Sequence, residues 1–141
     1  MKMFTQILAL LALFLGVVAG DFPPYGSPGD LQCTDIQMGD DHSVKAKCPV
    51  YQPDKLYLCS QMDLNHCYAN QDGRLEAREN GNFGSSCNNC RMYGTVLQCN
   101  CEISPGSGSF VTTSVDTNDV ILNQNGNLNC FLQLGWECQM W

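Results

Sequence analysis

An internal repeat with an offset of 53 residues is the feature that most restricts the fold of this chain. The segment Tyr68–Ala77 reads YANQDGRLEA, and the segment Ile121–Cys130 reads ILNQNGNLNC. The residues that recur are Asp63, Asn65, Asn70, Gln71, Gly73 and Leu75, which return as Asp116, Asn118, Asn123, Gln124, Gly126 and Leu128. Two tandem copies, about 31–84 and 85–131, therefore predict one domain made of two similar halves.

Each copy has the local chemistry of β-strands joined by tight hairpins. The segment Ser109–Val115 reads SFVTTSV and is rich in β-branched residues, which favour strands. Asp72-Gly73 and Asn125-Gly126 are the kind of pair that a type I′ turn requires, because both of its central residues have positive φ. We therefore predict an all-β fold of two pseudo-symmetric repeats, with a hairpin tip at each pair.

The ten cysteines predict a disulfide framework of five bridges. All of them lie beyond residue 32, and an even count is typical of a secreted domain. Cysteines placed symmetrically about a hairpin turn come within disulfide reach, which accounts for one pair in the first copy and two in the second. The expected pairs are Cys33–Cys48, Cys87–Cys101, Cys90–Cys99, Cys67–Cys130 and Cys59–Cys138. The sequence alone permits other connectivities, especially for the last two pairs.

The cross-copy pair follows from comparing the repeats. Cys67 stands where the second copy has Val120, and Cys130 stands where the first copy has Ala77. Each cysteine therefore lacks a partner in its own copy. If the copies exchange strands, Cys67 meets Cys130 and Val120 meets Ala77, which leaves Cys59 for Cys138.

The first 20 residues read as a secretory signal peptide. Lys2 precedes the apolar run ILALLALFLGVVAG, which is shorter than the roughly 18 residues of a spanning helix, so a membrane anchor is the weaker interpretation. Residues 21–30, DFPPYGSPGD, predict a flexible tail because prolines and glycines interrupt regular structure. We expect a secreted, extracellular protein of about 121 residues, without membrane insertion.

Charge excludes several classes of partner. Fourteen acidic and seven basic residues give a net charge of −7, and loss of Lys2 with the signal peptide brings it to about −8. An acidic chain of this kind does not suit nucleic acid or anionic membranes. Catalysis is not expected either, because His42 and His66 are the only histidines and no nucleophile or metalloprotease motif accompanies them.

We expect no metal and no cofactor. The segment YANQDGRLEARE has EF-hand-like spacing, but Tyr68 holds the first ligand position, where calcium needs a carboxylate. The segment CNNCRMYGTVLQCNC has a zinc-like spacing of four thiols. In an oxidising compartment the same spacing favours two bridges across one hairpin.

The two copies together resemble the cyanovirin-N homology (CVNH) domain, in particular its secreted fungal members. The second copy carries the pattern as Ser86-Cys87, Gly94, Leu97, Cys101, Phe110-Val111, Val115-Asp116, Asn118, Ile121, Asn123, Asn125-Gly126 and Leu128. The first copy carries it as Cys33, Cys48, Met62–Asn65, Asn70, Asp72-Gly73, Leu75 and Asn82-Phe83. The resemblance implies an elongated, pseudo-symmetric all-β domain in which the strands of the two repeats interleave. It also implies a shallow carbohydrate pocket near each end, typically for mannose-rich oligosaccharides.

Carried over by position, the resemblance implies two sets of carbohydrate-binding residues. The first pocket, which we expect to be the functional one, comprises Asn70, Asp72, Asn82, Ser85, Ser86, Glu102 and Ser104. The second comprises Asp30, Gln32, Tyr51, Asn123, Gln124 and Asn125, and Pro49 removes a backbone donor at its edge. The alternative role for all of these polar residues is to satisfy backbone groups at turns and strand ends.

Residues 132–141 form a C-terminal extension outside the repeat pattern, which we expect Cys138 to tie to the domain. Its Trp136 and Trp141 are candidates for covering apolar surface or for stacking on a sugar. The predicted function is that of a secreted non-catalytic lectin for mannose-containing glycans, acting as a monomer or a strand-swapped dimer. The alternative is a disulfide-stapled secreted structural or effector-like protein on the same fold, without sugar binding.

Overall fold

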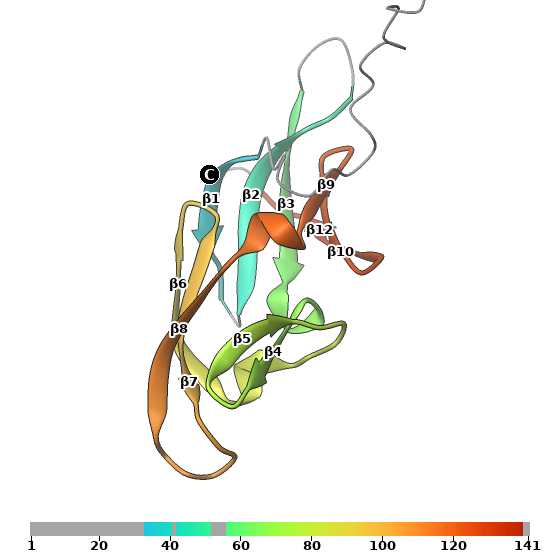
Figure 1. Cartoon of the computed structure of the whole chain (residues 1–141). Coiled ribbons are helices and arrows are strands. Elements are labelled where there is room, and N and C mark those ends of the chain that lie inside the picture. Colours follow the sequence, from blue (N-terminus) through green and yellow to red (C-terminus); the bar gives the residue numbers. More distant parts are fainter. Residues whose placement is uncertain (1–32, 41, 52–55, 140–141) are drawn as a thin grey trace, which may run out of the picture.

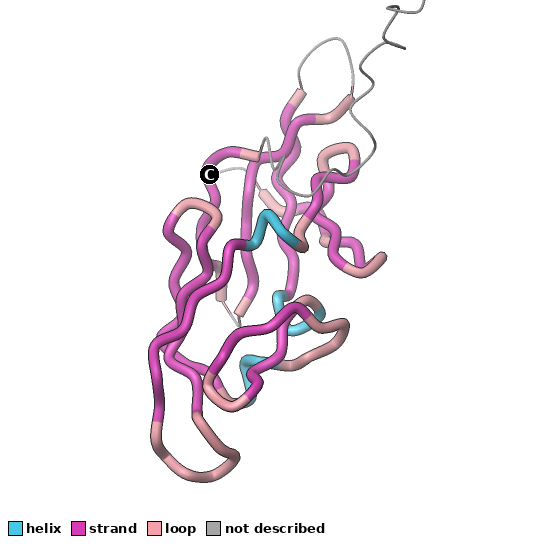
Figure 2. The backbone as a smooth tube through the Cα atoms, viewed as in Figure 1, coloured by secondary structure: helices cyan, strands magenta, loops and turns pink. Residues whose placement is uncertain are grey.

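The computed structural model describes residues 33–40, 42–51 and 56–139 and confirms the predicted all-β fold. Regular structure in these ranges consists of short strands and three single-turn 3-10 helices, as Figures 1 and 2 show. The predicted signal peptide, the predicted tail, Asp30, Gln32 and Trp141 lie outside the described residues. None of the described helices has the length and apolar character needed to cross a membrane.

Each repeat contributes one three-stranded antiparallel meander. In the first, the strands are β1 (Thr34–Met38), β2 (Ser43–Pro49) and β3 (Tyr57–Asp63). In the second, they are β6 (Cys87–Tyr93), β7 (Val96–Glu102) and β8 (Phe110–Asp116). The predicted strand at Ser109–Val115 is thus confirmed as β8, shifted by one residue at each end.

A 3-10 turn and a short hairpin follow each meander. The first repeat has η1 (Leu64–His66), β4 (Tyr68–Gln71), β5 (Arg74–Ala77) and η2 (Phe83–Ser85). The second has η3 (Thr117–Asp119), β9 (Leu122–Gln124) and β10 (Asn127–Cys130). The repeated aspartates begin η1 and η3 in the same way: Asp63 accepts from the Asn65 N–H at 2.9 Å, and Asp116 from the Asn118 N–H at 3.1 Å.

The two repeats interleave, because each hairpin packs on the last meander strand of the other repeat. The Leu75 N–H of β5 donates to Thr113 Oγ1 of β8 at 3.2 Å, and the Leu128 N–H of β10 donates to Ser60 Oγ of β3 at 2.9 Å. Donors and acceptors of the two bonds are related by the same 53-residue offset. In Figure 1 the β4–β5 hairpin lies beside β8, and the β9–β10 hairpin lies beside β3.

The hydrophobic core lies between the repeats and takes residues from both. Leu64, Tyr68 and Phe83 of the first repeat and Leu97 of the second are fully buried, together with most of the cysteines. The rings of Tyr68 and Phe83 meet edge to face with centroids 6.4 Å apart, a favourable geometry for aromatic pairs.

All five predicted disulfide pairs are confirmed, and no described cysteine is free. Cys33–Cys48, Cys87–Cys101 and Cys90–Cys99 link neighbouring strands of the meanders. Cys67–Cys130 joins the two repeats, as expected from the exchanged strands. The thiols of the zinc-like segment are therefore all consumed in disulfides.

The C-terminal extension adds two strands that the repeat did not predict. The strand β11 (Gln133–Leu134) pairs with β10, and β12 (Trp136–Glu137) pairs with β3 as the fourth strand of the first sheet. Cys138 forms the predicted bridge to Cys59. The two-residue turn before β11 consists of Phe131 (φ 49°) and Leu132 (φ 66°), a conformation that bulky residues rarely adopt.

Candidate functional site

The predicted hairpin tips are confirmed as turns with positive φ at both central residues. Asp72 and Gly73 have φ of 51° and 86°, and Asn125 and Gly126 have φ of 51° and 91°. The glycines also permit a close approach: a Cβ at Gly73 would lie 2.6 Å from Val111 Cγ2, and one at Gly126 would lie 2.6 Å from Val50 Cγ1. Each tip is therefore pressed against the opposite repeat.

Asn70 fixes the first tip with its whole side-chain amide. Its Oδ1 accepts from the Gly73 N–H at 2.8 Å, within the turn. Its Nδ2 donates to Ser86 Oγ and to the backbone carbonyl of Glu102, both at 2.9 Å. Because both amide hydrogens already have protein acceptors, Asn70 is a positioning residue that joins the tip to the end of β7.

Asn123 does the same at the second tip. Its Oδ1 accepts from the Gly126 N–H at 2.8 Å, and its Nδ2 donates to the Pro49 carbonyl at 2.9 Å. Pro49 and Glu102 each follow a disulfide cysteine, Cys48 and Cys101. The repeated asparagine therefore makes the same cross-repeat bond twice, between a hairpin of one copy and a strand end of the other.

The remaining first-pocket residues lie around this junction, and most are exposed. Asp72 is exposed at the tip, and one of its carboxylate oxygens accepts from Gln71 Nε2 at 3.0 Å. Asn82 is exposed, has φ of 52°, and makes no side-chain capping bond to η2. Ser85 Oγ donates to the Asn82 carbonyl at 2.9 Å, which places these two residues together beside Ser86.

Glu102 and Ser104 lie at the end of β7 and in the loop that follows it. The Glu102 carboxylate accepts from the Gly108 N–H at 2.7 Å, so it bridges its own loop. Ser104 is exposed in that loop. The structure thus joins Asn70, Ser86 and Glu102 by direct hydrogen bonds, and it places Asp72, Asn82, Ser85 and Ser104 on exposed segments that begin at this junction.

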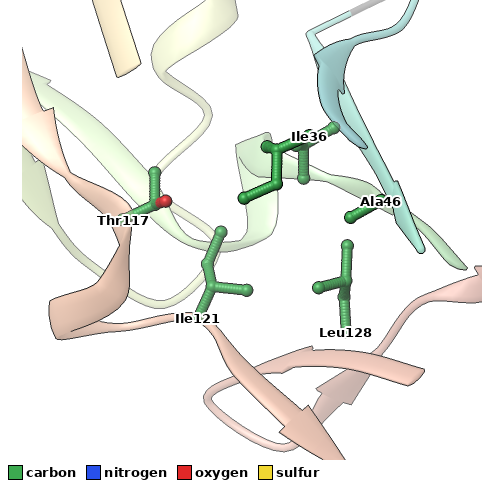
Figure 3. A pocket seen from close by; sticks show the side chains of 6 residues that line it. Ile36, Ala46, Thr117, Ile121 and Leu128 are labelled. Atoms are coloured by element: carbon green, nitrogen blue, oxygen red, sulfur yellow. The ribbon is translucent and has the colours of Figure 1, made fainter. Parts of the chain in front are cut away.

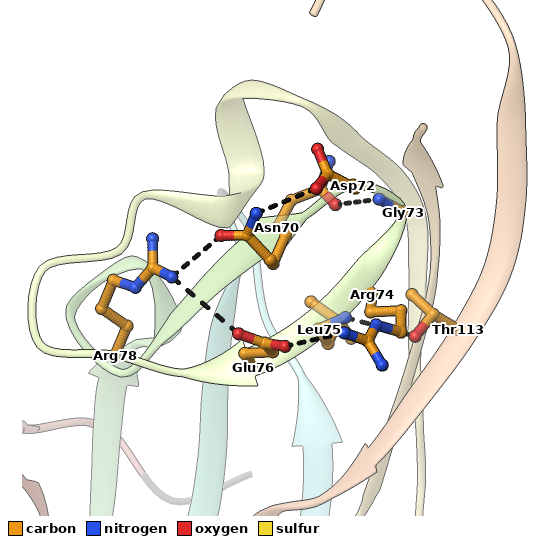
Figure 4. Close-up of polar contacts among 9 residues, drawn as sticks. Asn70, Asp72, Gly73, Arg74, Leu75, Glu76, Arg78 and Thr113 are labelled. Carbon is orange, nitrogen blue, oxygen red and sulfur yellow. Dashed lines mark hydrogen bonds and ion pairs between the residues drawn. The ribbon is translucent and has the colours of Figure 1, made fainter. Parts of the chain in front are cut away.

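Sequence reasoning missed a chain of polar contacts that holds the Asp72 side chain (Figure 4). Arg78 Nη2 donates to Gln71 Oε1 at 3.0 Å, and Gln71 in turn donates to Asp72. Glu76 forms ion pairs with Arg74 at 3.3 Å and with Arg78 at 3.9 Å. Strand alternation on β4 and β5 could have suggested this exposed row, but solvated pairs of this kind contribute little to stability.

Polar side chains of the second pocket also form hydrogen bonds with the protein. Asn125 Oδ1 accepts from the Tyr51 N–H at 2.8 Å, and Gln124 Oε1 accepts from Asn129 Nδ2 at 2.6 Å. Asn123 is buried. Of its predicted residues, Tyr51, Gln124 and Asn125 are exposed, while Asp30 and Gln32 lie outside the described ranges.

A small apolar cavity between the repeats is not part of either pocket (Figure 3). Its volume is about 10 Å³, and its lining residues are Ile36, Val44, Ala46, Thr117, Ile121 and Leu128. A cavity of this size is close to the minimum for one water molecule, and its lining offers almost no hydrogen-bonding partners. It cannot hold a sugar.

The buried tyrosine at the start of β4 has a perturbed titration. Burial raises the pKa of Tyr68 well above its usual range, and the nearby carboxylates of Asp119 and Asp116 raise it further. The phenol oxygen has no hydrogen-bond partner among the described residues. Tyr68 therefore stays protonated at physiological pH and serves the core rather than acid-base chemistry.

Comparison with known proteins matches residues 30–129 to the family model for the CVNH domain. Solved structures with the same fold include a variant of MoCVNH3 in complex with (N-GlcNAc)4, with TM-score 0.61, 19% identity, and 70% of this chain and 93% of that chain covered. The CVNH protein of Gibberella zeae matches with TM-score 0.57, 26% identity, and 70% and 92% covered. Microvirin bound to mannobiose matches with TM-score 0.56, 25% identity, and 70% and 93% covered. No curated protein matches the chain.

Proposed function

Because the chain belongs to the CVNH family, we propose that it is a secreted, non-catalytic lectin that binds mannose-containing oligosaccharides at the first pocket. Support for a sugar ligand comes from relatives of the same fold that were solved with (N-GlcNAc)4 and with mannobiose. Secretion rests on the signal-like segment at residues 1–20.

Equivalent positions in the two pockets differ in a way that favours the first pocket as the binding site. Asp72 and Asn125 occupy equivalent tip positions with the same φ of 51°. The Asn125 side-chain oxygen is bonded to the Tyr51 N–H, whereas one carboxylate oxygen of Asp72 has no donor among the residues that the structure describes. The first pocket also has exposed Asn82, Ser85 and Ser104 nearby.

These groups suit neighbouring sugar hydroxyls. A carboxylate accepts hydrogen bonds, serine hydroxyls both donate and accept, and an amide does both at fixed geometry. A site that pairs each hydroxyl rejects isomers that leave a protein group unpaired. The amides of Asn70 and the backbone of β7 hold these groups in place, so the ligand meets a preformed surface.

Two glycine variants test the proposal. Asp72→Gly and Asn125→Gly each remove one tip side chain at a position of positive φ, where glycine is tolerated. Glycan-array screening of the oxidised protein should show binding to mannose-rich glycans that Asp72→Gly abolishes and Asn125→Gly preserves. A flat array from the disulfide-complete wild type would reject the lectin function.

A second candidate function is favoured by the exposed apolar residues of the C-terminal extension and by Phe131, which immediately precedes it. Leu132 is 91% exposed, and Phe131, Leu134 and Trp136 are also exposed. Large exposed apolar groups of this kind mark protein-interaction surfaces. A structural or effector-like protein would lose partner binding in Leu132→Ser with Trp136→Ser, and its glycan array would be flat.

A further inference from the structure

The second three-stranded sheet has one face in the core and one face open to solvent. Along β7, Leu97, Cys99 and Cys101 are buried, while the alternating residues point the other way because successive strand residues face opposite sides. We call this open side the outer face. By the strand register it comprises the side chains of Asn88, Arg91, Tyr93, Val96, Gln98, Asn100, Glu102, Phe110, Thr112, Ser114 and Asp116.

The strand register arranges these residues in rows across the sheet. Asn100 is opposite Thr112, and Arg91 is opposite Gln98 on the neighbouring strand. Thr112 Oγ1 donates to Asn100 Oδ1 at 2.9 Å, so this row is already ordered. The aromatic residues lie at the two ends of the outer face, where Tyr93 is 55% and Phe110 is 46% exposed.

The outer face carries few charges: its carboxylates are Glu102, opposite Phe110, and Asp116, opposite Val96. Arg91 is its only cation and forms no ion pair within the described ranges. The carboxylate of Glu102, at the Phe110 end, is bonded to the Gly108 N–H. A face of amides, hydroxyls and exposed aromatic rings lacks the several cations that a polyanion such as nucleic acid requires.

The equivalent face of the first sheet carries a disulfide and two lysines. Cys59 stands there at the position of Thr112, and its bridge to Cys138 brings the C-terminal extension onto that sheet. Cys59 is only 2% exposed, and its carbonyl accepts from the Cys138 N–H at 3.0 Å. Lys45 and Lys47 also occupy the positions of Gln98 and Asn100. The two faces thus differ in chemistry: that of the first sheet carries two lysines and a buried disulfide, and that of the second carries one arginine, amides, hydroxyls and two exposed aromatic rings.

We propose that the outer face is a second binding site and that it takes a linear, uncharged polysaccharide lying along β7. A pyranose ring presents C–H groups that pack on an aromatic face and hydroxyls that pair with amides and hydroxyls. The rows of Phe110 and Tyr93 are six residues apart along β7, about 20 Å at ~3.3 Å per residue, so the site spans several sugar units. Its Phe110 end adjoins the tip pocket, because Phe110 is opposite Glu102, and the remainder of the site extends away from that pocket along β7.

A pelleting assay with insoluble cellulose and insoluble chitin tests the proposal. It uses the full oxidised protein that carries Asp72→Gly and Asn125→Gly, so that tip-pocket binding does not contribute. The expected result is pelleting with at least one polymer and an association constant that falls at least tenfold on adding Tyr93→Ala and Phe110→Ala. The matched control is Tyr57→Ala, the exposed aromatic that corresponds to Phe110 in the first repeat, which should leave pelleting unchanged.

Several results would overturn the proposal. One is the absence of pelleting with both polymers from a folded, disulfide-complete sample. Another is equal pelleting with and without the Tyr93→Ala and Phe110→Ala changes. A third is a dimer in sedimentation velocity that these two changes dissociate, because the outer face would then bind a second copy of the chain. The result that supports two distinct sites is loss of glycan-array binding in the single variant Asp72→Gly while its pelleting with the polymer is retained.

Discussion

Asn70 should contribute to stability rather than to ligand contact, and Asn70→Ala tests this role. The substitution removes three hydrogen bonds, one that closes the hairpin turn and two that tie the hairpin to the other repeat. It leaves the Gly73 N–H and the Glu102 carbonyl without their partners in a half-buried junction. At a net value of about 1 kcal/mol per bond, the free energy of unfolding should fall by about 2–4 kcal/mol.

Guanidinium chloride denaturation with the disulfides intact measures this change. The Asp72→Gly variant is the matched control, because it alters the same turn, has an exposed side chain and keeps a φ that glycine adopts easily. Its free energy of unfolding should change by less than about 1 kcal/mol. An equal midpoint in Asn70→Ala and wild type would refute the positioning role. Lost glycan binding at unchanged stability would instead make Asn70 a ligand contact.

Three further results follow from the core and the disulfides. Replacing Cys67 and Cys130 together by alanine should lower the free energy of unfolding by about 4 kcal/mol, and replacing Cys90 and Cys99 together should lower it by about 2.5 kcal/mol. The difference arises because the two bridges close loops with sequence separations of 63 and 9 residues. Denaturant titrations that rank the two variants in the opposite order would contradict this dependence on loop length. Ala77 and Val120 are the counterparts of Cys130 and Cys67. The double variant Ala77→Cys with Val120→Cys should form a sixth disulfide, and its intact mass should be lower by two hydrogen atoms than the mass of the same variant with these two thiols free. Tyr68→Phe should leave stability at pH 7 unchanged or raise it by about 1 kcal/mol, since the buried phenol oxygen has no hydrogen-bond partner among the described residues. The pKa of Tyr68 is raised in the folded state, so above about pH 10 the phenol ionises in the unfolded state first. The wild type should therefore lose stability above that pH, and Tyr68→Phe should lose less. Parallel pH profiles of stability for the two proteins would contradict this expectation.

The sequence predicted the fold well because its information is local and repeated. Asp72-Gly73 and Asn125-Gly126 fix two hairpin tips by backbone conformation alone. Cysteines spaced symmetrically around a turn define their partners, and the missing partners of Cys67 and Cys130 indicated the strand exchange. These features depend on the order of residues along the chain, which the sequence records directly.

The site was less predictable because its contacts join distant segments. Whether the amide of Asn70 faces a ligand or the protein depends on how closely the first hairpin approaches β7, which is decided by packing between the repeats. The C-terminal strands were missed for a different reason. Each of these strands has only two residues. The turn at Phe131 and Leu132 lacks the glycine or asparagine by which such a turn is predicted from sequence.

The proposal that the first pocket binds a mannose-containing glycan can be tested by calorimetric titration of the oxidised protein with a mannose-rich oligosaccharide. We expect saturable binding of one glycan per chain. This binding should be lost in Asp72→Gly and retained in Asn125→Gly. Absence of binding heat from a folded sample, or binding that survives Asp72→Gly unchanged, would contradict a glycan site at the first pocket.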